Sequence, residues 1–210
     1  MCLMRRRDLQ HHTYADYYIW SATHGDEVVD GVAYVREPPS PSRFHQEIAG
    51  ELYRQIANSL IGKRTRAYIA PFDVRLPKHS RADDQIDTVV QPDVFIVRDP
   101  RKLDDRGMIG APDWIAEILS RSTASYDRNI KLPMYERAGV SEAWLIDPTT
   151  RTVSISRMRA GHYVQPVIVE QKGQTSIAAI HGVSIDWDQL HAVSKSLNSR
   201  RVTRPQRRRA

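Results

Sequence analysis

The chain has 210 residues, of which 40% are hydrophobic, so it can bury one sizeable core but is short for two full domains. Cys2 is the single cysteine, which excludes an intramolecular disulfide and a cysteine-rich zinc site. The formal net charge is +6, which indicates nucleic-acid binding only if the basic residues share a surface.

The positive charge is concentrated at the C-terminal end. Residues 195–210 contain seven Lys or Arg and no acid, which leaves 24 basic and 25 acidic residues in the rest of the chain. This segment has no hydrophobic period and is expected to be a disordered tail. It is either a phosphate-binding arm or a solubilising terminus. As an arm it would bind nucleic acid through Arg200, Arg201, Arg204, Arg207, Arg208 and Arg209.

No apolar run approaches the roughly 20 residues that a membrane-spanning helix needs. The N-terminal residues also lack the apolar stretch of a signal peptide. We therefore expect a cytoplasmic protein with no membrane partner. Its expected parts are an N-terminal tail (1–13), one domain (14–194) and the basic tail (195–210).

The first part of the domain is expected to contain a strand pair and a long helix. Asp30 and Gly31 separate two apolar runs in the manner of a tight hairpin turn. A Pro-Ser stretch that can start a helix follows, and apolar residues then recur every four positions. They predict an amphipathic helix packed on a sheet, with Phe44, Ile48, Leu52, Ile56 and Leu60 along its apolar face.

The later elements predict the fold class. Three β-rich runs are expected to form central strands, at 67–76, 89–97 and 113–119. Residues 123–139 read as a helix that ends at Gly139, with Pro133 either kinking it or starting a new turn. A strand, a hairpin and a closing helix follow, at 141–148, 151–170 and 184–197. This order predicts an α/β fold, with a mixed, partly antiparallel central sheet flanked by helices.

Two carboxylates are the main candidates for a functional site. Asp93 follows Pro92, and Glu117 lies 24 residues later, near the end of the next predicted strand. Carboxylates on neighbouring strands can converge on one hard cation. Alternation places Glu117 on the same strand face as Ile115 and Leu119, where an acid needs a partner or a ligand. The alternative is that Asp93 caps a turn and Glu117 sits at an exposed strand end.

The chain resembles the Uma2 family in three segments that occur in the family's order, QPDVFIV, DWIAEILSRST and YDRNIKLPMYERAGVSEAWLIDP. The resemblance covers most of the chain but excludes the first dozen residues and the basic tail. It implies the restriction endonuclease-like, or PD-(D/E)XK, fold. In that fold the aspartate after proline and the strand glutamate bind a divalent metal, usually Mg²⁺, for which Mn²⁺ can substitute. The implied metal ligands are Asp93 and Glu117.

The position of the catalytic lysine departs from the superfamily pattern. The superfamily places a lysine two residues after the strand glutamate, where this sequence has Leu119. The Uma2 pattern has a lysine in the following helical segment, matched here by Lys131. The resemblance therefore implies that Lys131 is a displaced catalytic lysine that reaches back to Asp93 and Glu117. Without the resemblance, Lys131 would be interpreted as a solvated charge paired with Asp127 one turn earlier.

Two family positions near this lysine have expected supporting roles. Asp127 could orient Lys131, and the Ser120 hydroxyl could cap the next helix or contact phosphate. Ser120 lacks the sequence setting of a serine-hydrolase nucleophile.

Three more acids are candidates outside this segment. Related nucleases often supply a helical acid to the metal site, so Glu47 and Glu51 of the first helix are candidates, although exposed helix glutamates are the simpler interpretation. Asp73 also matches a family position, with a sheet-edge acid opposite Arg75 as the alternative. None of the three is singled out by its spacing alone.

The resemblance implies a metal-dependent endonuclease that hydrolyses phosphodiester bonds in nucleic acid, with DNA as the expected substrate. The alternative is a noncatalytic module that binds nucleic acid or protein and retains the nuclease fold, as Leu119 permits. An RNA-directed or toxin-like nuclease would use the same residues. A homodimer is suggested only by analogy with enzymes that cut both strands of a duplex.

Overall fold

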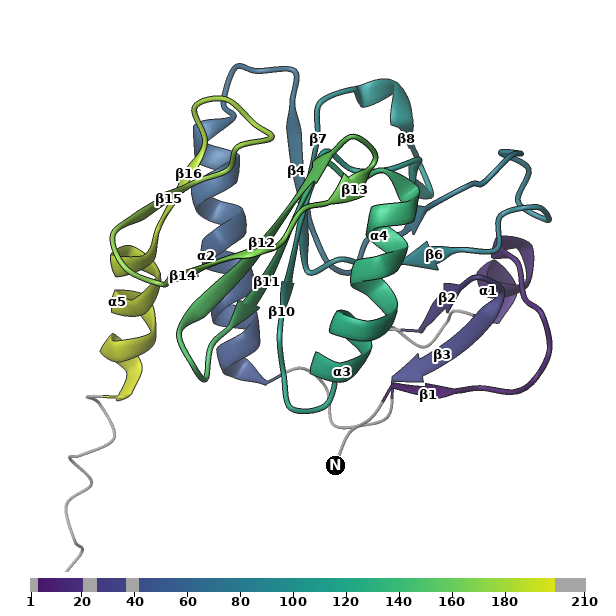
Figure 1. Ribbon diagram of the computed structural model, residues 1–210, viewed down its shortest axis with the longest axis horizontal. Helices are drawn as coiled ribbons and strands as arrows, with labels where there is room; N and C mark the ends of the chain where they lie inside the picture. Colours follow the sequence, from purple (N-terminus) through teal and green to yellow (C-terminus); the bar gives the residue numbers. More distant parts are fainter. Residues whose placement is uncertain (1–3, 21–25, 37–41, 199–210) are drawn as a thin grey trace, which may run out of the picture.

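The computed structural model describes residues 4–20, 26–36 and 42–198, in which the strands form two large sheets and one short hairpin (Figure 1). The first sheet has the order β1 (Met4–Arg6), β3 (Val32–Arg36), β2 (Glu27–Val29), β6 (Val89–Val90), β5 (Val74–Arg75), β9 (Gly107–Ile109) and β8 (Leu103–Asp104). The second has the order β13 (His162–Tyr163), β12 (Thr152–Arg159), β11 (Glu142–Asp147), β10 (Trp114–Ile118), β7 (Val94–Val97) and β4 (Arg66–Ile69), with β14 (Val167–Glu170) also paired to β12. The hairpin joins β15 (Gln174–Ser176) to β16 (Ser184–Asp186).

The helical elements lie mainly around the second sheet (Figure 1). In chain order they are α1 (Tyr14–Trp20), α2 (Arg43–Ser59), the 3₁₀ turn η1 (Pro100–Lys102), α3 (Ala124–Tyr126), the π-helical turn η2 (Asp127–Lys131), α4 (Leu132–Ala138) and α5 (Trp187–Asn198). None of the helices in the described part of the chain combines the length and apolar character needed to cross a membrane.

Opposite faces of the second sheet pack against different helices. On one face, Ile48 and Leu52 of α2 share a core with Trp114 and Ala116 of β10. The other face is covered by α4, where Tyr135 shares a second core with β10. Side chains alternate across a strand, so Glu117 points to the α4 side. Figure 1 shows α2 and α4 on the two sides of this sheet.

The predicted long helix is confirmed as α2, which begins after Ser42, whose side chain accepts a hydrogen bond from His45 N–H at 3.2 Å. Four of the five residues expected on its apolar face are buried. The prediction is wrong for Phe44, which is 39% exposed because it lies in the first helical turn, before the stretch that packs on the sheet.

The predicted helix at 123–139 is confirmed in outline but is not uniform. It runs from α3 through the π-helical turn η2 into α4, and it ends at Gly139 with a φ of 89°. Pro133 lies in the first turn of α4, directly after η2, so its missing N–H falls at the junction between the π-helical turn and the α-helix. Single π-helical turns are rare and are found often at functional sites.

The mixed α/β class is confirmed, but the strands form two large sheets where one central sheet was expected. The run 67–76 is divided: β4 is an edge strand of the second sheet, and β5 belongs to the first. Pro71 separates them, since it has no N–H to donate to a ladder. The expectation that this run forms a central strand is therefore wrong for β4.

Both tails are shorter than the sequence predicts. Residues 4–6 of the expected N-terminal tail form β1, which pairs with β3. The closing helix α5 continues to Asn198, so residues 195–198 are helical. Residues 199–210, including the six arginines of the expected phosphate-binding arm, lie outside the described residues.

Candidate active site

The candidate site lies where the chain crosses from the first sheet to the second. β6 of the first sheet leads through Gln91, Pro92 and Asp93 into β7 of the second. β7 is antiparallel to β10, and continuing their register places Asp93 opposite Glu117. The two carboxylates thus come together at one end of two central strands.

Asp93 is fixed by two contacts to one carboxylate oxygen. Ile118 N–H donates to Oδ2 at 2.7 Å, and His45 Nε2 lies 3.1 Å from the same atom. Burial opposes ionisation, but the contacts with His45 and Ile118 outweigh it and lower the pKa of Asp93. Asp93 is therefore ionised at neutral pH.

Lys131 is buried against Glu117. Its Nζ lies 2.7 Å from Glu117 Oε1 and donates to Glu27 Oε1 at 2.9 Å. Tyr135 OH donates to the same Glu117 oxygen at 2.5 Å. Lys131 is 2% exposed and Glu117 3%. The structure thus brings together the three residues predicted to be catalytic, while their chemical roles stay predictions.

The π-helical turn η2 buries both of its charged ends. Asp127 begins the turn and Lys131 ends it. Burial opposes the charge of Lys131, but Glu117, Glu27 and Asp127 outweigh burial and raise the pKa of Lys131. Burial raises the pKa of Glu117 to about 8 and that of Asp127 to about 7, against the opposing effect of Lys131 and with help from neighbouring carboxylates.

This donor set fits a hard divalent cation. Two carboxylates contact the Lys131 ammonium group, that of Glu117 at 2.7 Å and that of Glu27 at 2.9 Å, and the charges of Asp93 and Asp127 also act on it. Glu27 Oε2 is buried and accepts no hydrogen bond from the described residues. No three His, Cys, Asp or Glu side chains in the described ranges are grouped to hold an ion by themselves. A cation here would have two carboxylate ligands and complete its shell with water, as Mg²⁺ does in many proteins.

The other sequence candidates have structural partners outside this cluster. Glu51 accepts hydrogen bonds from Arg54 Nε at 2.8 Å and from Gln55 Nε2 at 3.0 Å. Gln55 also bonds the backbone of Asp186, so this part of α2 faces β16 and α5. Glu51 is thus buried rather than exposed, and its described hydrogen-bond partners are Arg54 and Gln55 rather than residues of the Asp93 site.

Glu47 and Ser120 have different surroundings. Glu47 Oε1 lies 3.5 Å from Arg43, while its Oε2 is buried and makes no hydrogen bond among the described residues. Ser120 Oγ accepts from Thr123 N–H at 3.2 Å and contacts the hydroxyls of Ser122 and Thr123. Ser120 therefore holds the turn before α3, but the N-cap of that helix is Thr123, which makes no side-chain capping bond. A contact between Ser120 and phosphate stays a prediction.

Asp73 is connected to the cluster through one residue. It accepts hydrogen bonds from Tyr17 OH and from Gln91 Nε2, both at 2.9 Å. The backbone N–H of Gln91 donates to Glu27 Oε1 at 2.8 Å. Burial raises the pKa of Asp73 despite these donors. Asp73 is thus not a sheet-edge acid that opposes Arg75, since its described hydrogen-bond partners are Tyr17 and Gln91.

Three residues of the cluster were given no role by the sequence. Glu27 precedes the apolar pair of β2, and an acid that shares a strand face with Val29 was a usable signal. His45 lies in the first turn of α2 and Tyr135 in α4, and neither position has a spacing that predicts contact with a carboxylate on a strand. Their roles depend on how the helices dock.

Comparison with known proteins identifies the family of the chain. The model of the Uma2 family, described as "Putative restriction endonuclease", matches residues 15–188. The chain belongs to the Uma2 family. Its membership confirms the resemblance drawn from the sequence and places the chain in a nuclease family. A search of curated proteins finds no match.

A solved structure extends the comparison to the Uma2 fold. It is described as the crystal structure of a putative nuclease belonging to DUF820 from Anabaena variabilis ATCC 29413. It superposes with a TM-score of 0.66 at 20% sequence identity, covering 87% of this chain and 98% of that chain. At this identity the likeness shows the shared fold, and it supports the expected restriction endonuclease-like core.

Proposed function

We propose that this Uma2 chain is a Mg²⁺-dependent endonuclease that hydrolyses phosphodiester bonds in DNA. The observation that carries the proposal is the 2.7 Å contact between Lys131 Nζ and Glu117 Oε1. It supplies a lysine to the strand carboxylates although Leu119 occupies the usual position. A site with Asp93, Glu117 and a lysine has the residue types that phosphodiester hydrolysis requires.

Each residue has a distinct part in the proposed reaction. A cation bound by Asp93 and Glu117 would polarise the phosphodiester and lower the pKa of a coordinated water. Ile118 N–H and His45 hold Asp93 in a fixed, ionised state. Lys131 carries a positive charge that would stabilise the charge developing on the phosphate oxygens. Tyr135 fixes the Glu117 carboxylate by donating to Oε1.

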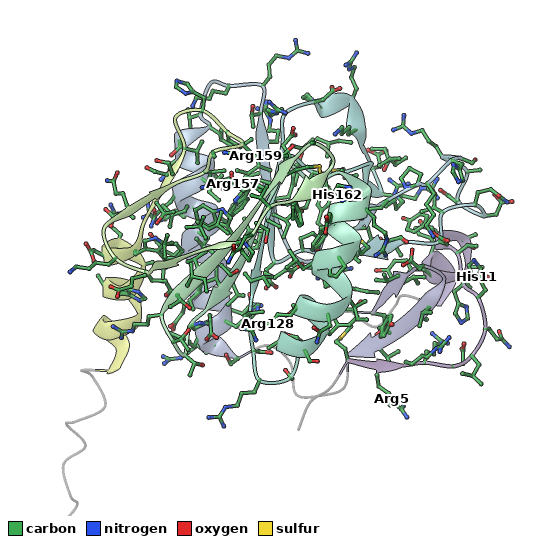
Figure 2. The ribbon with its side chains drawn as sticks, in the orientation of Figure 1. Arg5, His11, Arg128, Arg157, Arg159 and His162 are labelled. Atoms are coloured by element: carbon green, nitrogen blue, oxygen red, sulfur yellow. The ribbon has the colours of Figure 1, made fainter. Side chains whose placement is uncertain are left out.

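Surface cations offer places for the nucleic-acid backbone. Arg128 lies in the π-helical turn next to Asp127 and is half exposed, 3.4 Å from Asp147. Figure 2 shows Arg128 near α3, whereas Arg157 and Arg159 lie toward the other end of β12. Arg128 neighbours Asp127 of the cluster in sequence and is half exposed, so we expect it to contact a phosphate near the site.

The proposal is tested by cleavage of supercoiled plasmid and labelled single strands in Mg²⁺, Mn²⁺ and EDTA. We expect metal-dependent cutting by the native chain, and a rate at least about a thousandfold lower for Glu117→Ala and Lys131→Ala. Glu51→Gln is the matched control, because this acid lies on the same helix as His45 but outside the cluster. A native chain that binds DNA and cuts none would overturn the proposal.

A noncatalytic binding module is the second candidate. It is favoured by the near-complete burial of Lys131 and Glu117, which keeps both side chains from solvent. The C-terminal arginines would then supply affinity without chemistry. Deleting residues 200–210 should flatten the slope of log affinity against log salt by about 0.9 for each phosphate that the arm neutralises. An unchanged slope would show that the arm does not bind DNA.

A further inference from the structure

Glu27 is a buried acid of the first sheet that meets the site of the second. It begins β2 and is 2% exposed. Its Oε1 accepts two hydrogen bonds, from Lys131 Nζ at 2.9 Å and from Gln91 N–H at 2.8 Å. Its Oε2 is buried and makes no hydrogen bond with the described residues. The proposed reaction assigns no part to this carboxylate.

Lys131 is shared between two carboxylates that have different surroundings. Glu117 Oε1 receives both Lys131 and Tyr135 OH. An ammonium group on this oxygen competes with any cation that binds the same carboxylate, because both are positive and occupy the same side of it. Glu27 gives the ammonium a second negative partner, so that it need not rely on Glu117.

The position of Glu27 is also fixed by a backbone contact. Glu27 Oε1 accepts a hydrogen bond from the backbone N–H of Gln91. Gln91 lies two residues before Asp93, where the chain crosses from one sheet to the other. Gln91 Nε2 in turn donates to Asp73 at 2.9 Å and to Tyr17 OH at 3.0 Å. A carboxylate held in this way cannot follow Lys131 toward Glu117, and it keeps the ammonium at a set place.

We propose that Glu27 is a positioning residue that holds Lys131 while Glu117 binds a divalent cation. The inference rests on the proposed metal site and deepens it. Glu27 acts through Lys131, from which it accepts a hydrogen bond at 2.9 Å, and the inference assigns it no contact with the ion. Loss of Glu27 would remove one of the two carboxylates that contact the ammonium group and leave the group to Glu117.

The test is a double-mutant cycle on binding of Mn²⁺ alone, without nucleic acid, by calorimetry on the full chain. The four proteins are the native chain, Glu27→Gln, Lys131→Met and the double variant. We expect Glu27→Gln to weaken Mn²⁺ binding about tenfold, which is about 1.4 kcal/mol, when Lys131 is present. In the Lys131→Met background the same change should weaken binding by no more than about twofold.

Other outcomes contradict the inference in recognisable ways. An equal loss in both backgrounds would show that Glu27 acts on the ion directly, and it would overturn the inference alone. A native chain that binds no Mn²⁺ would overturn the proposed metal site and this inference with it. Thermal unfolding of all four proteins controls for folding. Glu27→Asp, which keeps the charge, should retain Mn²⁺ affinity to within about threefold of native.

Discussion

Lys131 and Arg75 are both buried cations with acidic partners, but the two clusters are built differently. Arg75 is 1% exposed, and its guanidinium bonds Asp104, which is 41% exposed at its side chain. It also lies 4.8 Å from the centre of the Tyr14 ring. The partners of Lys131, Glu27 and Glu117, are as buried as the lysine itself.

The pKa values of Asp104 and Glu117 are consequently shifted in opposite directions. Burial opposes the charge of Asp104, but the Arg106 backbone N–H and Arg75 outweigh it and lower the pKa of Asp104. Burial wins at Glu117, where the pKa rises to about 8. The Arg75 pair joins two strands of the first sheet and leaves its acid partly exposed to water, whereas the carboxylates that contact Lys131 are buried with it. Perturbation of this kind is typical of functional sites.

The largest expected difference between the clusters is in cleavage. Lys131→Met should lower the cleavage rate about a thousandfold or more and leave a folded protein, because the raised pKa values let nearby acids take up protons in its absence. Arg75→Met should leave cleavage by the folded protein within about twofold. Single-turnover rates at saturating DNA check both. Equal losses of cleavage rate in the two variants would contradict the assignment of Lys131 to catalysis and Arg75 to stability.

The next effect is in the pH dependence of stability. In the metal-free fold the pKa of Glu117 is about 8 and that of Asp127 about 7, above their ordinary values of 4.5 and 3.8. The native state therefore binds more protons than the unfolded chain between those limits. Stability should fall as pH rises from about 5 to about 8, by at most about 1.4 kcal/mol per pH unit for each group.

Urea unfolding in EDTA at pH 5.5, 7 and 8.5 measures this slope. Glu117→Gln should flatten it, because the amide does not titrate. Saturating Mn²⁺ should also flatten it, since a bound cation replaces the protons. A metal-free stability that rises across this range would show that these carboxylates are ionised in the fold.

A smaller effect is expected from Arg75 on stability. Arg75→Met should lower the free energy of unfolding by about 1–2 kcal/mol, a modest cost because Asp104 can be solvated once its partner is removed. Arg106→Met is a matched control, since Arg106 pairs with Asp83 at 2.7 Å on the surface, and its unfolding midpoint should be nearly unchanged. Urea unfolding at pH 7 compares the two.

The smallest effect is expected for Glu51→Gln, the acid that the sequence left open as a site candidate. Its partners are Arg54 and Gln55, and neither reaches Asp93. Cleavage and Mn²⁺ affinity should stay within about twofold of native, with a melting temperature lower by about 2 °C. A loss of Mn²⁺ affinity as large as that of Glu117→Ala would show that Glu51 belongs to the site.

Local sequence patterns predicted individual helices and strands better than they predicted which strands share a sheet. The four-residue period of α2 and the Gly139 stop are confirmed, since each depends on neighbours in sequence. The division into two sheets was not predicted, because which strands pair depends on contacts between distant residues. The run 67–76 has one composition, yet β4 and β5 join different sheets.

The same limit applies to the candidate site. Asp93 could be chosen because it follows a proline, and Glu117 because of its place in the alternation of a predicted strand. Lys131 could be chosen because of the family pattern. Glu27 and Tyr135 could not be placed, since one comes from the other sheet and the other from a helix whose rotation is set by the π-helical turn η2. The alternative interpretation of Lys131 as a solvated charge is wrong, as its burial shows.

The contact between Lys131 and Glu27 joins residues 104 positions apart in the chain. Closing so long a loop costs entropy, and contacts of this kind form late in folding. During synthesis the cluster can form only after Lys131 has emerged from the ribosome. Strand β11, which pairs with β10 beside Glu117, is synthesised later still. A nascent chain would thus carry the proposed catalytic centre only once most of its domain has been made.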